Sequence, residues 1–98
     1  MSRSAKKRAR PKWHPEVEEF YRGVLARWSV EGDRRAMALL AQACDAMQRR
    51  MEIQKVVARD GYVVRTAAGG TRRHPLLSAL KEAESVFLAS VRELGLEP

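Results

Sequence analysis

The distribution of lysines and arginines is the feature of this chain that points to a chemical role, the binding of polyanions. The chain has 98 residues and a formal net charge of +7. Its first 12 residues hold six cations and no acid: Arg3, Lys6, Lys7, Arg8, Arg10 and Lys12. The other 13 basic residues are nearly balanced by 12 acidic ones. Because concentrated basic segments commonly bind nucleic acid, we expect residues 1–12 to form a DNA-binding arm that is disordered without a partner.

Other roles for this arm stay open. It could be a solubilising tail, or part of an interaction protein that binds no nucleic acid. A contact with an acidic membrane surface would favour bulky apolar residues beside the charges, and no aromatic or branched aliphatic residue precedes Trp13. If the arm does bind DNA through phosphates, the binding should be strongly salt-dependent and largely blind to sequence.

A second, smaller group of cations lies in residues 60–75, which read DGYVVRTAAGGTRRHP. Residues 62–64 are β-prone, two glycines follow at 69–70, and residues 71–74 can run back, which predicts a β-hairpin over about 62–74. A plain loop between helices is the alternative. The hairpin would present three arginines, which we expect to bind DNA, with a solvated face as the alternative: Arg65, Arg72 and Arg73. Arg34 and Arg35 could form a third basic group.

Patterns for catalysis or metal binding are missing from the sequence. His14 and His74 lie 60 positions apart, and neither has a cysteine, histidine or aspartate at metal-ligand spacing. There is no phosphate-binding loop of the GxxxxGK type. We therefore expect no enzyme activity, no metal and no cofactor. Cys44 is the only cysteine and is expected to be a small core residue.

Helices are predicted on both sides of the hairpin. Apolar residues recur at three- and four-residue steps over about 15–28, 34–59 and 75–94. Pro15 and Pro75 suit first helical turns, Asp33 is a candidate N-cap, and Gly61 and Gly95 are expected stops. The predicted fold is mainly α: a helical hairpin of the first two helices, the short β-hairpin, and a third helix. Residues 13–98 then form a single helical domain.

The long second helix carries an apolar seam with spacings of 3, 4, 3 and 4 residues: Met37, Leu40, Cys44, Met47 and Met51. A second apolar set lies off this seam, and the two faces exceed what the first helix alone could cover. We therefore predict that the seam is a subunit interface of an oligomer. In the alternative, a monomeric three-helix bundle, the second helix is simply the central element.

Membrane insertion and secretion are not indicated. No apolar run approaches the roughly 20 residues that span a bilayer, and no apolar segment of the secretory type follows the basic N-terminus. We expect a cytoplasmic protein.

The order of several short motifs resembles that of phage terminase small subunits. Asp60-Gly61 is followed by Gly69-Gly70, by His74-Pro75, and by the sequence RELGLEP at residues 92–98. Upstream lie Trp28, Asp33 and the long helix with Cys44. The resemblance covers about residues 28–98, and its motifs are informative by their order and spacing, since each alone is common.

This resemblance implies a fold and a role that composition does not show. It implies a ring-shaped homo-oligomer that binds double-stranded phage DNA in the bacterial host cell. The ring would present the DNA to the large terminase subunit, which has the ATPase and nuclease activities, so the small subunit would not be an enzyme. The motif positions are expected to be mostly structural: Gly61, His74, Pro75, Leu94, Gly95 and Pro98.

The chain departs from the family pattern in two places. Many members continue past the GL-P segment with an arginine-containing tail that could contact the large subunit, whereas this sequence stops at Pro98. The docking site of the large subunit is therefore in doubt. The region before the second helix is too short for a separate helix-turn-helix domain, so we expect the basic arm and hairpin arginines to bind DNA instead. A small oligomeric nucleic-acid-binding regulator that uses the basic arm is the alternative function.

Overall fold

The computed structural model describes residues 12–96, which form three helices and a two-stranded hairpin. Helix α2 spans Pro15–Arg27 and helix α3 spans Arg34–Asp60. Strands β1 (Val63–Arg65) and β2 (Thr71–Arg73) follow, and helix α4 spans Leu77–Leu94. The strands pair antiparallel. The mainly helical fold with a short hairpin is therefore as predicted.

Local capping explains where most of these elements begin and end. The Nδ1 atom of His14 accepts the amide N–H of Glu16 at 3.1 Å at the start of α2. The Asp33 carboxylate accepts the amide N–H of Ala36 at 3.1 Å at the start of α3. Helix α3 ends at Gly61 with φ 89°, and α4 ends at Gly95 with φ 73°, conformations that glycine adopts at little cost.

Helix α4 begins two residues later than the sequence suggested. Pro75 and Leu76 form a turn, and the helix starts at Leu77. The amide of Leu77 donates to the carbonyl of His74 at 3.1 Å, and the amide of Leu76 donates to the His74 ring at 3.0 Å. These two bonds use the polar groups of His74 to close a turn ahead of the helix, so Pro75 precedes the helix instead of opening it.

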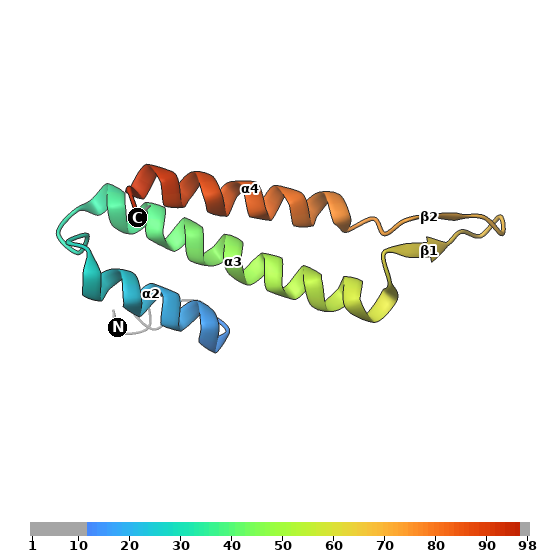
Figure 1. The fold of residues 1–98 in the computed structure, drawn as a ribbon, viewed down its shortest axis with the longest axis horizontal. Helices are drawn as coiled ribbons and strands as arrows, with labels where there is room; N and C mark the ends of the chain where they lie inside the picture. Colours follow the sequence, from blue (N-terminus) through green and yellow to red (C-terminus); the bar gives the residue numbers. More distant parts are fainter. Residues whose placement is uncertain (1–11, 97–98) are drawn as a thin grey trace, which may run out of the picture.

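The long helix α3 is the central element (Figure 1). Helix α2 lies beside its N-terminal half, as expected for the first two helices, and α4 runs antiparallel beside it as well. The hairpin projects beyond the ends of α3 and α4. The described fold is therefore elongated, with dimensions of 55 × 40 × 20 Å.

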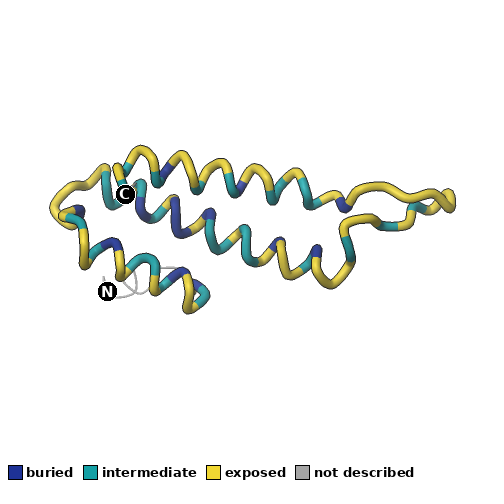
Figure 2. The backbone as a smooth tube through the Cα atoms, viewed as in Figure 1, coloured by how far each residue is buried: buried dark blue, intermediate teal, exposed yellow. Residues whose placement is uncertain are grey.

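The core lies along α3, which has more buried positions than any other element of the described chain (Figure 2). Leu40 and Cys44 are completely buried and pack in one cluster with the side chains of α2 and its flanking turns: Trp13, Val17, Val24 and Val30. On its other side, α3 buries Ala43, Ala46, Ile53 and Val57.

The predicted seam is thus packed largely within one chain. Leu40 and Cys44 have no exposed surface, whereas Met37, Met47 and Met51 are half-buried against the same cluster. In this conformation only the three methionines of the seam offer any surface to a neighbouring subunit. A subunit interface along the seam remains a prediction.

Candidate nucleic-acid interface

The hairpin places its three arginines on two faces. In the antiparallel register, Arg65 lies opposite Thr71, Arg72 opposite Val64, and Arg73 opposite Val63. Directly opposed residues share a face, and successive residues alternate. Arg65 and Arg73 are therefore on one face of the ribbon and Arg72 is on the other. All three are exposed.

A short turn brings the two strands together. The Thr66 amide donates to the Gly70 carbonyl at 2.9 Å, and the Gly69 amide donates to the Thr66 carbonyl at 3.0 Å. The Gly70 amide also donates to the Thr66 hydroxyl at 3.1 Å. Gly69 has φ 91°, which a residue with a Cβ would adopt only with strain. These contacts fix the register that places the arginines.

The electrostatics of the hairpin are uniformly positive. No acidic residue occurs between Asp60 and Glu82. Among residues 12–96, no ion pair involves any of the three hairpin arginines. Their charges are therefore available to an external anion, and phosphate is a good match for the planar guanidinium group.

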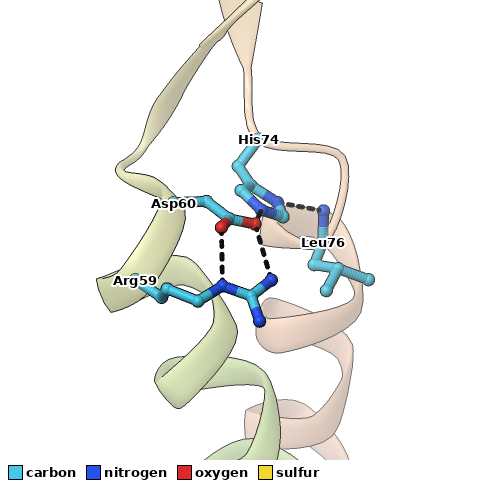
Figure 3. A network of polar contacts seen from close by, with 4 residues as sticks. All are labelled: Arg59, Asp60, His74 and Leu76. Atoms are coloured by element: carbon cyan, nitrogen blue, oxygen red, sulfur yellow. Dashed lines mark hydrogen bonds and ion pairs between the residues drawn. The ribbon is translucent and has the colours of Figure 1, made fainter.

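A network of polar contacts closes the neck of the hairpin, which we define as Arg59, Asp60, His74 and Leu76 (Figure 3). Arg59 Nε donates to Asp60 Oδ1 at 2.8 Å, and Arg59 Nη2 donates to Asp60 Oδ2 at 3.3 Å. His74 Nε2 lies 3.0 Å from the same Oδ2 atom. The hydrogen bond from Arg59, followed by that from His74, lowers the pKa of the Asp60 carboxyl to about 2.

This pKa predicts a pH-dependent contribution to stability. A carboxyl whose pKa is lower in the folded chain stabilises it above the unfolded pKa of about 4, and the effect disappears as the pH falls towards about 2. Asp60→Asn should therefore have a lower melting temperature than the wild type at pH 5 to 7. The difference should shrink from about pH 4 and be lost once the pH has fallen below about 2. Thermal unfolding of both proteins across this range is the measurement, and a difference that stays constant with pH would contradict the assignment.

The basic arm lies almost entirely outside the described residues. This applies to Arg3, Lys6, Lys7, Arg8 and Arg10, whereas Lys12 is described and exposed. The residues after Lys12 fix the point at which the arm joins the domain. Trp13 is buried, its indole N–H donates to Asp45 Oδ1 at 3.1 Å, and its ring lies 5.3 Å from that of Tyr21. The His14 amide also donates to Gln48 Oε1 at 2.7 Å.

The point where the arm joins the domain is therefore set apart from the base of the hairpin. The anchor at Gln48 is 12 residues from the end of α3 at Asp60, which is about 18 Å along a helix. The suggested third basic group, Arg34 and Arg35, differs from the hairpin arginines because one of its charges is paired. Arg35 Nη2 donates to Glu93 Oε1 at 3.0 Å, while Arg34 is exposed.

The bridge between Asp60 and His74 was not predicted from the sequence, in which Asp60 was considered only as part of the motif Asp60-Gly61 and His74 only as a structural residue at the end of the hairpin. The available signal was their placement, because they flank the two ends of the predicted hairpin and closing it brings them together.

Within residues 12–96, no three histidine, cysteine or carboxylate side chains gather as a metal site. None of the helices described here combines the length and apolar character required to traverse a bilayer.

A protein-family model matches most of the fold described above. A family model described as the small subunit of phage terminase matches residues 31–98. The match includes α3, the hairpin, its neck and α4, and it confirms the resemblance seen in the sequence. Comparisons with curated proteins and with solved structures gave no significant match. Because the family model covers well over half of its length, the chain belongs to the phage terminase small subunit family.

Proposed function

We propose that this chain binds double-stranded DNA and presents it to the large terminase subunit during genome packaging in the bacterial cytoplasm. The large subunit supplies the ATPase and nuclease activities, and this chain regulates them without catalysis of its own. The observation that carries the proposal is the projecting hairpin, whose three exposed arginines have no ion-pair partner among the described residues. Family membership favours this role over that of a small DNA-binding regulator.

The hairpin suits DNA by shape as well as by charge. The major groove is wide enough for a two-stranded β-ribbon. Because Arg72 is on one face and Arg65 and Arg73 are on the other, a ribbon in the groove would direct cations towards both phosphate walls. Contacts of this kind position a protein on DNA without reading the bases. We therefore expect binding to be salt-dependent and to show little sequence preference.

The arm adds a second set of phosphate contacts. Lys12 marks its attachment beside the middle of α3. The 11 residues that precede Lys12 can span at most about 36 Å when fully extended, which exceeds the separation of about 18 Å between the anchor and the hairpin base. One DNA segment can thus meet both basic sites.

We also propose that the chain functions as a homo-oligomeric ring. Helix α4 exposes Val86 and Leu88, the latter with 58% of its surface accessible, and the three half-buried seam methionines add apolar surface on α3. Several copies in a ring would repeat the hairpin, so that individually weak phosphate contacts add through avidity. The absolute mass in solution, measured by light scattering, tests this assembly.

The experiment that tests the proposed function measures whether this chain raises the DNA affinity of the large terminase subunit from the same genome. If this chain presents DNA, it should contact both partners at once, and the affinity of the large subunit should rise by the coupling between them.

A further inference from the structure

Two joints connect the hairpin to the helical body. On one side α3 runs into β1 through Gly61, whose φ of 89° and ψ of 159° lie in a region open mainly to glycine. On the other side β2 runs into α4 through His74, Pro75 and Leu76. The first ladder bond, from the His74 amide to the Tyr62 carbonyl at 2.7 Å, ties the strands to each other and not to the helices.

The direction of the hairpin therefore depends on what spans the joints. The joint to α4 is closed by the turn at Pro75, in which the Leu77 amide donates to the His74 carbonyl. The joint to α3 has no comparable turn. The Gly61 amide donates to the Val57 carbonyl at 2.6 Å, and beyond this bond Gly61, which lacks a side chain, allows a wider range of backbone directions. Arg65 lies four residues beyond Gly61, about 13 Å along an extended strand, so a tilt of about 15° would move it by about 3 Å. A displacement of that size breaks a hydrogen bond to phosphate.

The His74 ring spans both joints. Only 6% of the residue is exposed, and each ring nitrogen has a partner (Figure 3). The Leu76 amide donates to Nδ1 at 3.0 Å, so Nδ1 must carry its lone pair. The proton of the neutral ring is then on Nε2, which donates to Asp60 Oδ2 at 3.0 Å. One nitrogen is thus bonded to the start of α4 and the other to the last residue of α3.

Arg59 completes this arrangement from the opposite side. Its guanidinium holds both oxygens of the Asp60 carboxylate, at 2.8 and 3.3 Å, and so orients the oxygen that faces His74. The carboxylate at the end of α3 is therefore held as a fixed acceptor for the His74 ring.

We propose that His74 is a positioning residue for DNA binding, which holds the hairpin arginines in a fixed direction through its bond to Asp60. This inference rests on the proposed function, because the bond from His74 to Asp60 can affect DNA binding only if the hairpin contacts DNA. His74 does not touch DNA itself. Its bond to Asp60 narrows the range of backbone directions at Gly61 before binding, so that the arginines meet phosphates without first losing conformational freedom.

A double-mutant cycle tests the proposal. His74→Asn keeps an acceptor close to the position of Nδ1 for the Leu76 amide but cannot reach Asp60. Asp60→Ala removes the same bond from the other side. Each variant, and the double variant, should bind random double-stranded DNA about three- to tenfold more weakly at 50 mM salt. The effects on DNA affinity should not add, because the bond between His74 and Asp60 is missing from all three variants. The slope of log affinity against log salt should also become shallower by about 0.9, the value for one phosphate contact.

A second readout is independent of DNA. In the free wild-type chain, nitrogen NMR should find His74 protonated on Nε2, and hydrogen exchange of the hairpin amides should be faster in both single variants. A proton on Nδ1, or hairpin exchange and DNA affinity equal to those of the wild type in both variants, would overturn the proposal.

A third protein separates failure of this inference from failure of the proposed function. It replaces all three hairpin arginines with glutamine and leaves the neck intact. If this triple variant binds DNA like the wild type, the hairpin is not a DNA contact and the proposed function fails at this site together with the inference. If the triple variant is weakened while His74→Asn and Asp60→Ala are not, the inference alone fails.

Discussion

Replacing Arg65, Arg72 and Arg73 with glutamine is expected to weaken binding to random double-stranded DNA by about 10- to 100-fold at 50 mM salt. Each arginine is exposed and none has an ion-pair partner among residues 12–96, so each can neutralise a phosphate. Loss of three phosphate contacts should lower the slope of log affinity against log salt by about 2.7. Fluorescence anisotropy of a labelled duplex at several salt concentrations measures both quantities.

The matched control removes the same charge elsewhere. Arg27, Arg49 and Arg92 are exposed on the three helices, and their replacement with glutamine lowers the net charge equally. This control should bind within about threefold of the wild type, because a distant charge acts only through a screened field. Equal weakening by both triple variants would mean that overall charge, and not the hairpin, determines the affinity.

Leu40→Ala is expected to destabilise the fold by about 2 to 5 kcal/mol. Leu40 is completely buried in the cluster that joins α2 to α3, so the shorter side chain loses burial and leaves a cavity. A domain of this size has a free energy of unfolding of only about 5 to 15 kcal/mol. Urea denaturation should show a lower midpoint with an unchanged slope.

Leu88→Ala provides the comparison, because it is the same substitution at a residue of α4 with 58% of its surface exposed. At a protein concentration low enough to separate subunits, its effect on the free energy of unfolding should stay within about 0.5 kcal/mol. A loss as large as that of Leu40→Ala under these conditions would contradict the burial described for a single chain.

Local signals in the sequence were enough to predict the elements. Asp33, Gly61 and Gly95 act at the helix ends where they were expected, because caps depend on a few neighbouring residues. The β-hairpin was predicted from its two glycines and its β-prone arm, and Gly69 has the positive φ that such a turn requires. The start of α4 was misplaced because the His74 ring and carbonyl close a turn over Pro75, which no spacing rule encodes.

Tertiary contacts explain what the sequence did not predict. The surplus of apolar surface on α3 was counted against the first helix alone, but Trp13 and Val30, which lie outside α2, help to cover Leu40 and Cys44. The bridge from Asp60 to His74 joins residues 14 positions apart and exists only once the hairpin has closed. The division of the arginines between two faces follows from the strand register, which depends on the turn at Thr66 and Gly70.

The most direct test of the central claim is the affinity of the large terminase subunit for DNA, measured with and without this chain. A labelled duplex is titrated with the large subunit alone, with the large subunit and the wild-type chain, and with the large subunit and the hairpin triple variant. We expect a complex of all three partners and an affinity about 5- to 150-fold higher with the wild-type chain, with most of the gain lost for the triple variant. An affinity unchanged by the wild-type chain, with no complex of the three partners, would contradict the claim that this chain presents DNA to the packaging motor.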